Sequence, residues 1–111
     1  KAVKLLRRSA EQGLVKAQYS LGVMYENGWG VMRDNTEALN WYREAARRGL
    51  AEAQYTFAEF YEQGKVVAKD KGMALQWYQK AAKLGHAKAQ AKFDALSNKF
   101  QKMAQNNSDA S

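Results

Sequence analysis

Few residues of this 111-residue chain could carry acid–base or nucleophilic chemistry. It has one histidine, His86, and no cysteine, which rules out a disulfide scaffold, a thiolate metal site and a cysteine nucleophile. His86 follows Gly85 in a predicted turn, and no serine is identifiably paired with it as a nucleophile. We therefore expect a surface histidine, no catalytic residue and no metal ligand.

The acidic residues form no catalytic pair either. Asp34 and Asp70 each stand just before a predicted helix, where a carboxylate caps free backbone N–H groups. Glu52, Glu59 and Glu62 fall along one predicted helix and are expected to be solvated charges. The sequence thus predicts a protein that is not an enzyme and that uses no cofactor.

Four large aromatic residues could in principle form a ligand cage: Trp41, Tyr42, Trp77 and Tyr78. The second pair repeats the first after 36 residues, and both lie on the apolar face of a predicted helix. This recurrence favours packing in the hydrophobic core over ligand binding.

Trp29 does not recur in this way. It lies between Gly28 and Gly30 in a predicted loop, and the next copy of the pattern has Lys65 at that position. A position that serves only the fold would tend to keep its aromatic residue, and tryptophan is enriched at interface hot spots. Contact with a partner and a ring folded over a helix end both stay open as interpretations of Trp29.

The charge of the chain is basic but unevenly distributed. Lysine and arginine outnumber the acids 18 to 11, for a net charge of +7. Residues 1–33 carry +4, residues 34–69 carry −1 and residues 70–111 carry +4. A near-neutral middle argues against a continuous stripe that follows phosphates. We expect no nucleic acid partner, and a basic surface for nucleic acid or acidic membrane lipid is the alternative function.

The hydrophobic residues never form a run long enough to span a bilayer, and no signal-peptide core is visible. We expect a soluble domain that is not integral to the membrane. The lack of cysteine is compatible with cytoplasm and periplasm alike. Because the chain begins with Lys1 and not with methionine, an upstream segment is expected.

The chain repeats itself at an offset of 36 residues. When residues 10–45 are compared with residues 46–81, 16 of the 36 positions are identical. A third copy begins near Ala82 and then drifts, and half a copy precedes the first. The predicted organisation is half a repeat (1–13), two whole repeats (14–49 and 50–85), a divergent capping helix (86–104) and a disordered tail (105–111).

Each repeat predicts two helices. Ala17, Leu21 and Tyr25 recur at four-residue spacing along the first helix, and Gly28 is placed to end it. The second helix begins after Asp34 and ends at the next glycine. No stretch alternates as a strand would, so the predicted fold class is all-α. Helix pairs that cannot bury their apolar faces alone are expected to stack into a right-handed solenoid.

Two further features of the repeat concern the packing between helices. Gly22 costs helix stability, so we expect it to permit the close approach of a neighbouring helix. Gln18, Gln54 and Gln90 occupy equivalent positions and are expected to hydrogen-bond backbone groups between helices.

The fixed positions between Ala10 and Gly49 read Ala-x-x-Gly-x-x-x-Ala-Gln-Tyr-x-Leu-Gly-x-x-Tyr-x-x-Gly-x-Gly-Val-x-x-Asp-x-x-x-Ala-x-x-Trp-Tyr-x-x-Ala-Ala-x-x-Gly. This pattern resembles the Sel-1-like repeat, a relative of the tetratricopeptide repeats, over about residues 2–93. The resemblance implies an adaptor or scaffold in protein complexes, of a kind often found in bacteria. The absence of cysteine separates the chain from the cysteine-rich, β-lactamase-like members of that family.

The first helix of each pair lines the concave side in solenoids of this kind, so its exposed positions that vary between repeats are the candidate binding residues. They are Lys16, Ser20, Val23 and Asn27 in the first copy, Glu52, Thr56, Glu59 and Gln63 in the second, and Lys88 and Lys92 in the third. Their charge runs weakly basic, acidic and then strongly basic. We expect a protein or peptide partner with a charge pattern of its own, with Trp29 as a loop contact; no oligomeric state is predicted. Simple solvation of these residues is the other interpretation.

Overall fold

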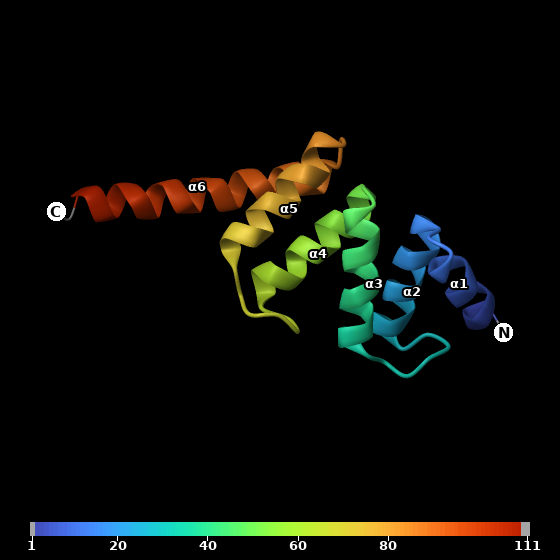
Figure 1. Cartoon of the computed structure of the whole chain (residues 1–111). Coiled ribbons are helices and arrows are strands. Elements are labelled where there is room, and N and C mark those ends of the chain that lie inside the picture. Colours follow the sequence, from blue (N-terminus) through green and yellow to red (C-terminus); the bar gives the residue numbers. More distant parts are fainter. Residues whose placement is uncertain (1, 110–111) are drawn as a thin grey trace.

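Six α-helices follow one another along the chain in the computed structural model, which describes residues 2–109 and the side chains of residues 4–99, 101 and 102. They are α1 (Ala2–Glu11), α2 (Val15–Asn27), α3 (Asn35–Arg47), α4 (Ala51–Gln63), α5 (Lys71–Lys83) and α6 (Ala87–Asp109). Each helix packs against the next one in sequence, and the described residues contain no strand. The result is an elongated molecule of 61 × 26 × 17 Å, with α1 and the far end of α6 at opposite ends (Figure 1). This arrangement confirms the predicted all-α repeat solenoid.

The helix boundaries follow from the predicted capping residues. The Asp34 side chain accepts hydrogen bonds from the backbone N–H groups of Thr36 and Glu37, at 3.0 and 3.1 Å. Asp70 accepts in the same way from Met73 at 3.0 Å. Both carboxylates therefore satisfy free N–H groups at the start of the second helix of a repeat, as expected.

The core consists mainly of alanines on facing helices, with a few tyrosines, leucines and phenylalanines between them. Tyr42 and Tyr78 are 1% and 0% exposed, whereas Trp41 and Trp77 are only partly buried at the edge of the core. The predicted core role is thus confirmed most fully for the two tyrosines. The two tryptophans pack against the core with one part of each ring and leave another part near the surface.

Gly22 lets α2 approach α3 closely. A Cβ atom at this position would lie 2.6 Å from Cε1 of Tyr42, a distance at which two carbon atoms overlap. The predicted role of Gly22 in close helix packing is therefore confirmed.

Two of the three equivalent glutamines connect neighbouring repeats as predicted. Gln18 donates from Nε2 to the carbonyl oxygen of Ala10, and Gln54 repeats this contact with Ala46, both at 3.1 Å. The prediction is wrong for Gln90, which is exposed and donates to Oδ1 of Asp94 at 3.0 Å. In the other two repeats a glycine or an alanine occupies the position of Asp94, so no side chain one turn away competes for the amide.

The last helix is longer than the sequence suggested. Helix α6 continues through residues 105–109, which were assigned to a disordered tail, and residues 110–111 lie outside the described part of the chain. No glycine or proline occurs between Ala87 and Asp109 to end the helix. None of the helices within residues 2–109 is both long and apolar enough to cross a bilayer.

Candidate functional site

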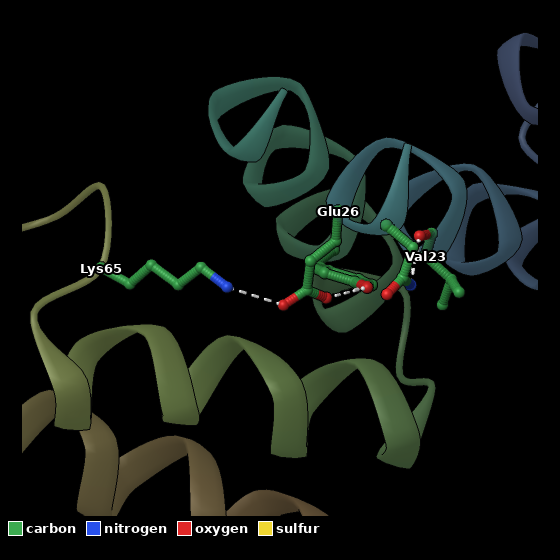
Figure 2. A network of polar contacts seen from close by, with 5 residues as sticks. Val23, Glu26 and Lys65 are labelled. Carbon is green, nitrogen blue, oxygen red and sulfur yellow. Dashed lines mark hydrogen bonds and ion pairs between the residues drawn. The ribbon is translucent and has the colours of Figure 1, made fainter. Parts of the chain in front are cut away.

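A partly buried contact between a tyrosine and a glutamate connects the two helices of each whole repeat. In the first repeat the Tyr42 hydroxyl donates to Oε1 of Glu26 at 2.7 Å. The other carboxylate oxygen of Glu26 accepts from Nζ of Lys65 at 2.9 Å. Figure 2 shows Lys65 extending from the loop after α4 towards Glu26 on α2, so this ion pair joins successive repeats.

These contacts change the acid–base properties of both groups. Burial alone would raise the pKa of Glu26, but the hydrogen bonds from Lys65 and Tyr42 outweigh it and lower that pKa. Burial and the carboxylate of Glu26 raise the pKa of Tyr42 far above its ordinary value. The hydroxyl of Tyr42 therefore stays protonated and keeps donating to Glu26.

The second repeat contains the same contact. The Tyr78 hydroxyl donates to Oε1 of Glu62 at 2.6 Å, and Nζ of Lys92 on α6 lies 3.8 Å from the same oxygen. The expectation that Glu62 is a solvated charge was therefore wrong. Tyr78 and Glu62 stand 36 residues after Tyr42 and Glu26. This shared recurrence was the feature of the sequence that could have indicated that the tyrosine and the glutamate act as a pair.

Glu59 is the carboxylate in this region whose negative charge is least balanced by nearby basic side chains. It is partly buried, and no basic side chain described in the structure lies within ion-pairing distance of it. Burial raises the pKa of Glu59, and the charges of Glu26 and Glu62 add to this, against the opposing attraction of Lys92. The expectation of a solvated charge was wrong here too, because Glu59 is held partly out of water beside two other carboxylates.

Two adjoining hollows open along α2, α4 and the start of α6, and they share Tyr19, Thr56 and Glu59. We call the two together the groove. The first hollow brings together the predicted residues Val23, Asn27, Thr56, Glu59 and Gln63. The second adds the predicted residues Glu52 and Lys88.

The remaining predicted residues lie elsewhere. Lys16 and Ser20 line a separate apolar hollow that also contains Leu6 and Leu14. Lys92 lines neither hollow of the groove and is directed to the carboxylate of Glu62. The structure therefore brings together the predicted residues of the second copy but divides those of the first.

Several residues that line the groove were missed by the sequence analysis. Tyr19 and Tyr55 form aromatic walls beside Glu59. They were missed because candidates were chosen for differing between repeats, whereas these two tyrosines are identical. Glu26 and Lys65 also line the first hollow. Their place in it depends on an ion pair between successive repeats, which the sequence does not show.

His86 has a structural role at the start of α6. Its Nδ1 accepts from the backbone N–H of Ala89 at 3.1 Å, and its ring stacks on Tyr55 with 4.8 Å between centroids. Among the side chains that the structure describes, no three His, Cys, Asp or Glu residues are grouped to hold a metal ion.

Trp29 lies in the loop that follows α2, two residues beyond Asn27. Its side chain is 60% exposed, and Met32 in the same loop is 90% exposed. This exposure favours contact with a partner over a ring folded onto the helix end. The loop presents two large apolar side chains to the surroundings.

The chain matches known proteins in sequence and in fold. A family model described as Sel1 repeat matches residues 1–14, 15–50 and 51–86. A Sel1 repeat protein from Oxalobacter formigenes has a similar structure, with a TM-score of 0.83 and 45% identity over 85% of this chain and 71% of that one.

Two other solved structures are similar. The protective antigen c5321 of uropathogenic Escherichia coli, described as displaying an SLR fold, has a TM-score of 0.79 and 39% identity over 87% of this chain and 21% of its own. The cysteine rich protein B of Helicobacter pylori has a TM-score of 0.76 and 26% identity over 80% of this chain and 67% of its own.

A shorter match is to the chitin synthase regulator SKT5 of the fungus Malassezia restricta, with 54% identity over 37 residues. That match spans 33% of this chain and only 3% of the fungal protein. Sel1 repeats generally mediate protein–protein interactions. With three family matches that together cover most of its length, the chain belongs to the Sel1 repeat family.

Proposed function

We propose that this chain is a non-catalytic adaptor that binds a segment of a partner protein or peptide in the groove along α2, α4 and α6. The observation that carries this proposal is Glu59, a partly buried carboxylate that forms no ion pair with any described side chain, beside Tyr19 and Tyr55. A basic side chain of the partner would supply the missing positive charge while its alkyl stem covers the tyrosine rings.

The other charges along the groove set the orientation of the partner. Glu52 and Lys88 line the same hollow, so opposite charges flank the position of Glu59. Lys92, next to Glu62, adds positive charge on the side of α6. A partner segment with a basic centre and an acidic flank complements this pattern in one direction only.

Trp29 supplies an apolar contact at the edge of this surface. Its loop begins directly after Asn27, which lines the first hollow. A tryptophan with this exposure offers a large contact area at little cost in side-chain entropy.

The proposal is tested by reversing the charge of Glu59. The immobilised chain is exposed to an extract of the cells that produce it, and the retained proteins are quantified by mass spectrometry. Glu59→Lys should lower the retention of the partner about tenfold or more, because a lysine then occupies the position intended for the partner's cation. Helix content by circular dichroism should stay nearly unchanged, since Glu59 takes part in no ion pair within the described residues.

Asp94→Lys is the matched control. Asp94 is exposed on α6, lines neither hollow, and its replacement changes the net charge by the same amount. This variant should retain the partner as the unmodified chain does. Equal retention by all three proteins would contradict the proposed groove. Nucleic acid or acidic lipid retained by all three and removed by moderate salt would instead support the basic-surface alternative.

A further inference from the structure

A separate pocket lies on another face of the first repeat, between α1, α2 and α3. One side is formed by the partly buried ring of Trp41, and the carboxylates of Glu11, Glu37 and Glu44 line it. Gln18 lines it as well; this side chain is 2% exposed, and its Oε1 accepts no hydrogen bond among the described residues. Arg43 and Arg48 line it too, so the three carboxylates leave the lining with one net negative charge beside an aromatic face and a free acceptor.

The second repeat shows what such an aromatic face can hold. Trp77 is the equivalent of Trp41, and Nζ of Lys80 lies over its ring at 4.3 Å from the centroid. Lys80 stands 36 residues after Glu44, so the two occupy the same place in their repeats. The second repeat thus covers its tryptophan with its own ammonium group, and the first repeat has a carboxylate at that place.

Two positive groups, Arg43 and Arg48, also line this pocket, and each is engaged by another residue of the same lining. Arg43 donates from Nη2 to Oδ1 of Asn40 at 3.0 Å, and Nε of Arg48 lies 3.7 Å from Oε1 of Glu44. Among the described side chains, no cation lies over the ring of Trp41. Glu11 and Glu37 form no ion pair within this part of the chain.

We propose that this pocket binds a lysine or arginine side chain of a partner polypeptide, with the cation over Trp41 in the way that Lys80 lies over Trp77. Among the aromatic side chains, tryptophan attracts a cation over its ring face most strongly, and nearby carboxylates add to this attraction. The aliphatic stem of the incoming side chain fits the apolar edge of the ring, while its donors face acceptors. This site is independent of the groove proposed above, because it shares none of the residues that line it.

The test follows the indole N–H resonances of the ¹⁵N-labelled chain by NMR during titration with the peptide acetyl-Gly-Lys-Gly-amide. Replacement of each tryptophan by phenylalanine assigns the three resonances. The Trp41 resonance should shift and saturate, with an affinity at least about threefold higher than for the same peptide with norleucine in place of lysine. The Trp77 resonance should not respond, because Lys80 already covers that ring.

Two variants make the test decisive. Glu44→Lys places an ammonium group where Lys80 stands in the second repeat and should abolish the response of Trp41 to the lysine peptide. Lys80→Gln alters the equivalent position of the other repeat and should leave the response of Trp41 unchanged. Circular dichroism confirms that both variants keep their helix content.

Three outcomes would overturn the proposal. The norleucine peptide binding as tightly as the lysine peptide would reduce the pocket to an apolar surface. An unaltered response in Glu44→Lys would place the cation elsewhere. Tetramethylammonium binding as tightly as the lysine peptide would identify a site for a free cation and not for a polypeptide side chain.

Discussion

The hydroxyl of Tyr42 lies 2.7 Å from Oε1 of Glu26 and donates a hydrogen bond to it, and Tyr78 makes the same contact with Glu62 at 2.6 Å. Each contact joins the second helix of a repeat to the first, over a separation of 16 residues. In the first repeat Lys65 extends the contact to the following repeat. The pair therefore contributes both to the helix hairpin and to the stacking of repeats.

Removal of the Tyr42 hydroxyl should destabilise the fold measurably. Tyr42→Phe leaves the ring in place but takes away a hydrogen bond to a charged group, which typically contributes about 1.5–3 kcal/mol. Urea unfolding followed by circular dichroism measures the change in the free energy of unfolding. Tyr61→Phe removes a hydroxyl without a hydrogen bond among the described contacts and should cost about 0.5 kcal/mol or less. Equal losses in both variants would show that the contact with Glu26 stabilises nothing.

Gly22→Ala should also destabilise the chain, although alanine favours helices by about 1 kcal/mol over glycine. The added methyl group would overlap the ring of Tyr42, and overpacking of this kind costs about 1–3 kcal/mol. We expect a net loss in thermal unfolding experiments. Ala58 at the equivalent position of the second repeat is 0% exposed, so Ala58→Gly should lose about 1 kcal/mol from helix propensity and about 0.8 kcal/mol more from the buried methyl group. A higher melting temperature for Gly22→Ala would mean that Tyr42 moves aside at little cost.

Glu59→Gln should raise the stability of the chain at neutral pH. Burial holds the pKa of Glu59 in the folded state above its ordinary value of 4.5, so the folded state disfavours the charged form. This penalty is fully present above the raised folded pKa and disappears as the pH falls below the unfolded value. The melting temperatures of the two proteins should therefore differ at pH 7 and converge as the pH falls through that window. A difference that is independent of pH would show that the charge of Glu59 is not the cause.

Most of the fold could be predicted from local sequence patterns. The capping by Asp34 and Asp70 depends on backbone groups two or three residues away, so it is visible in the sequence itself. The roles of Gly22 and Gln18 could be predicted because a second copy of the repeat identifies positions that serve packing. The same comparison failed for Gln90, since only the divergent last helix has an acidic side chain one turn later.

The candidate site was less predictable because its properties depend on contacts between repeats. The positions of Thr56, Glu59 and Gln63 on one helix face follow from helical spacing, and they do line one hollow. The environment of Glu59 follows from spacing only in part, because Tyr55 and Glu62 lie on the same helix one turn away whereas Glu26 comes from α2. Selection of variable positions therefore found the polar members of the groove and missed its aromatic walls.

The sequence by itself determined the helices, their 36-residue period and their capping residues, because these depend on neighbours within one or two helical turns or on comparison of the copies. Only the tertiary structure decided which charges meet. Lys65 reaches Glu26 across 39 residues, and Glu59 becomes partly buried beside carboxylates from two helices. The physical reason is that stacking of the helix pairs sets the distance and the solvent exposure of such groups, and neither is specified by local sequence.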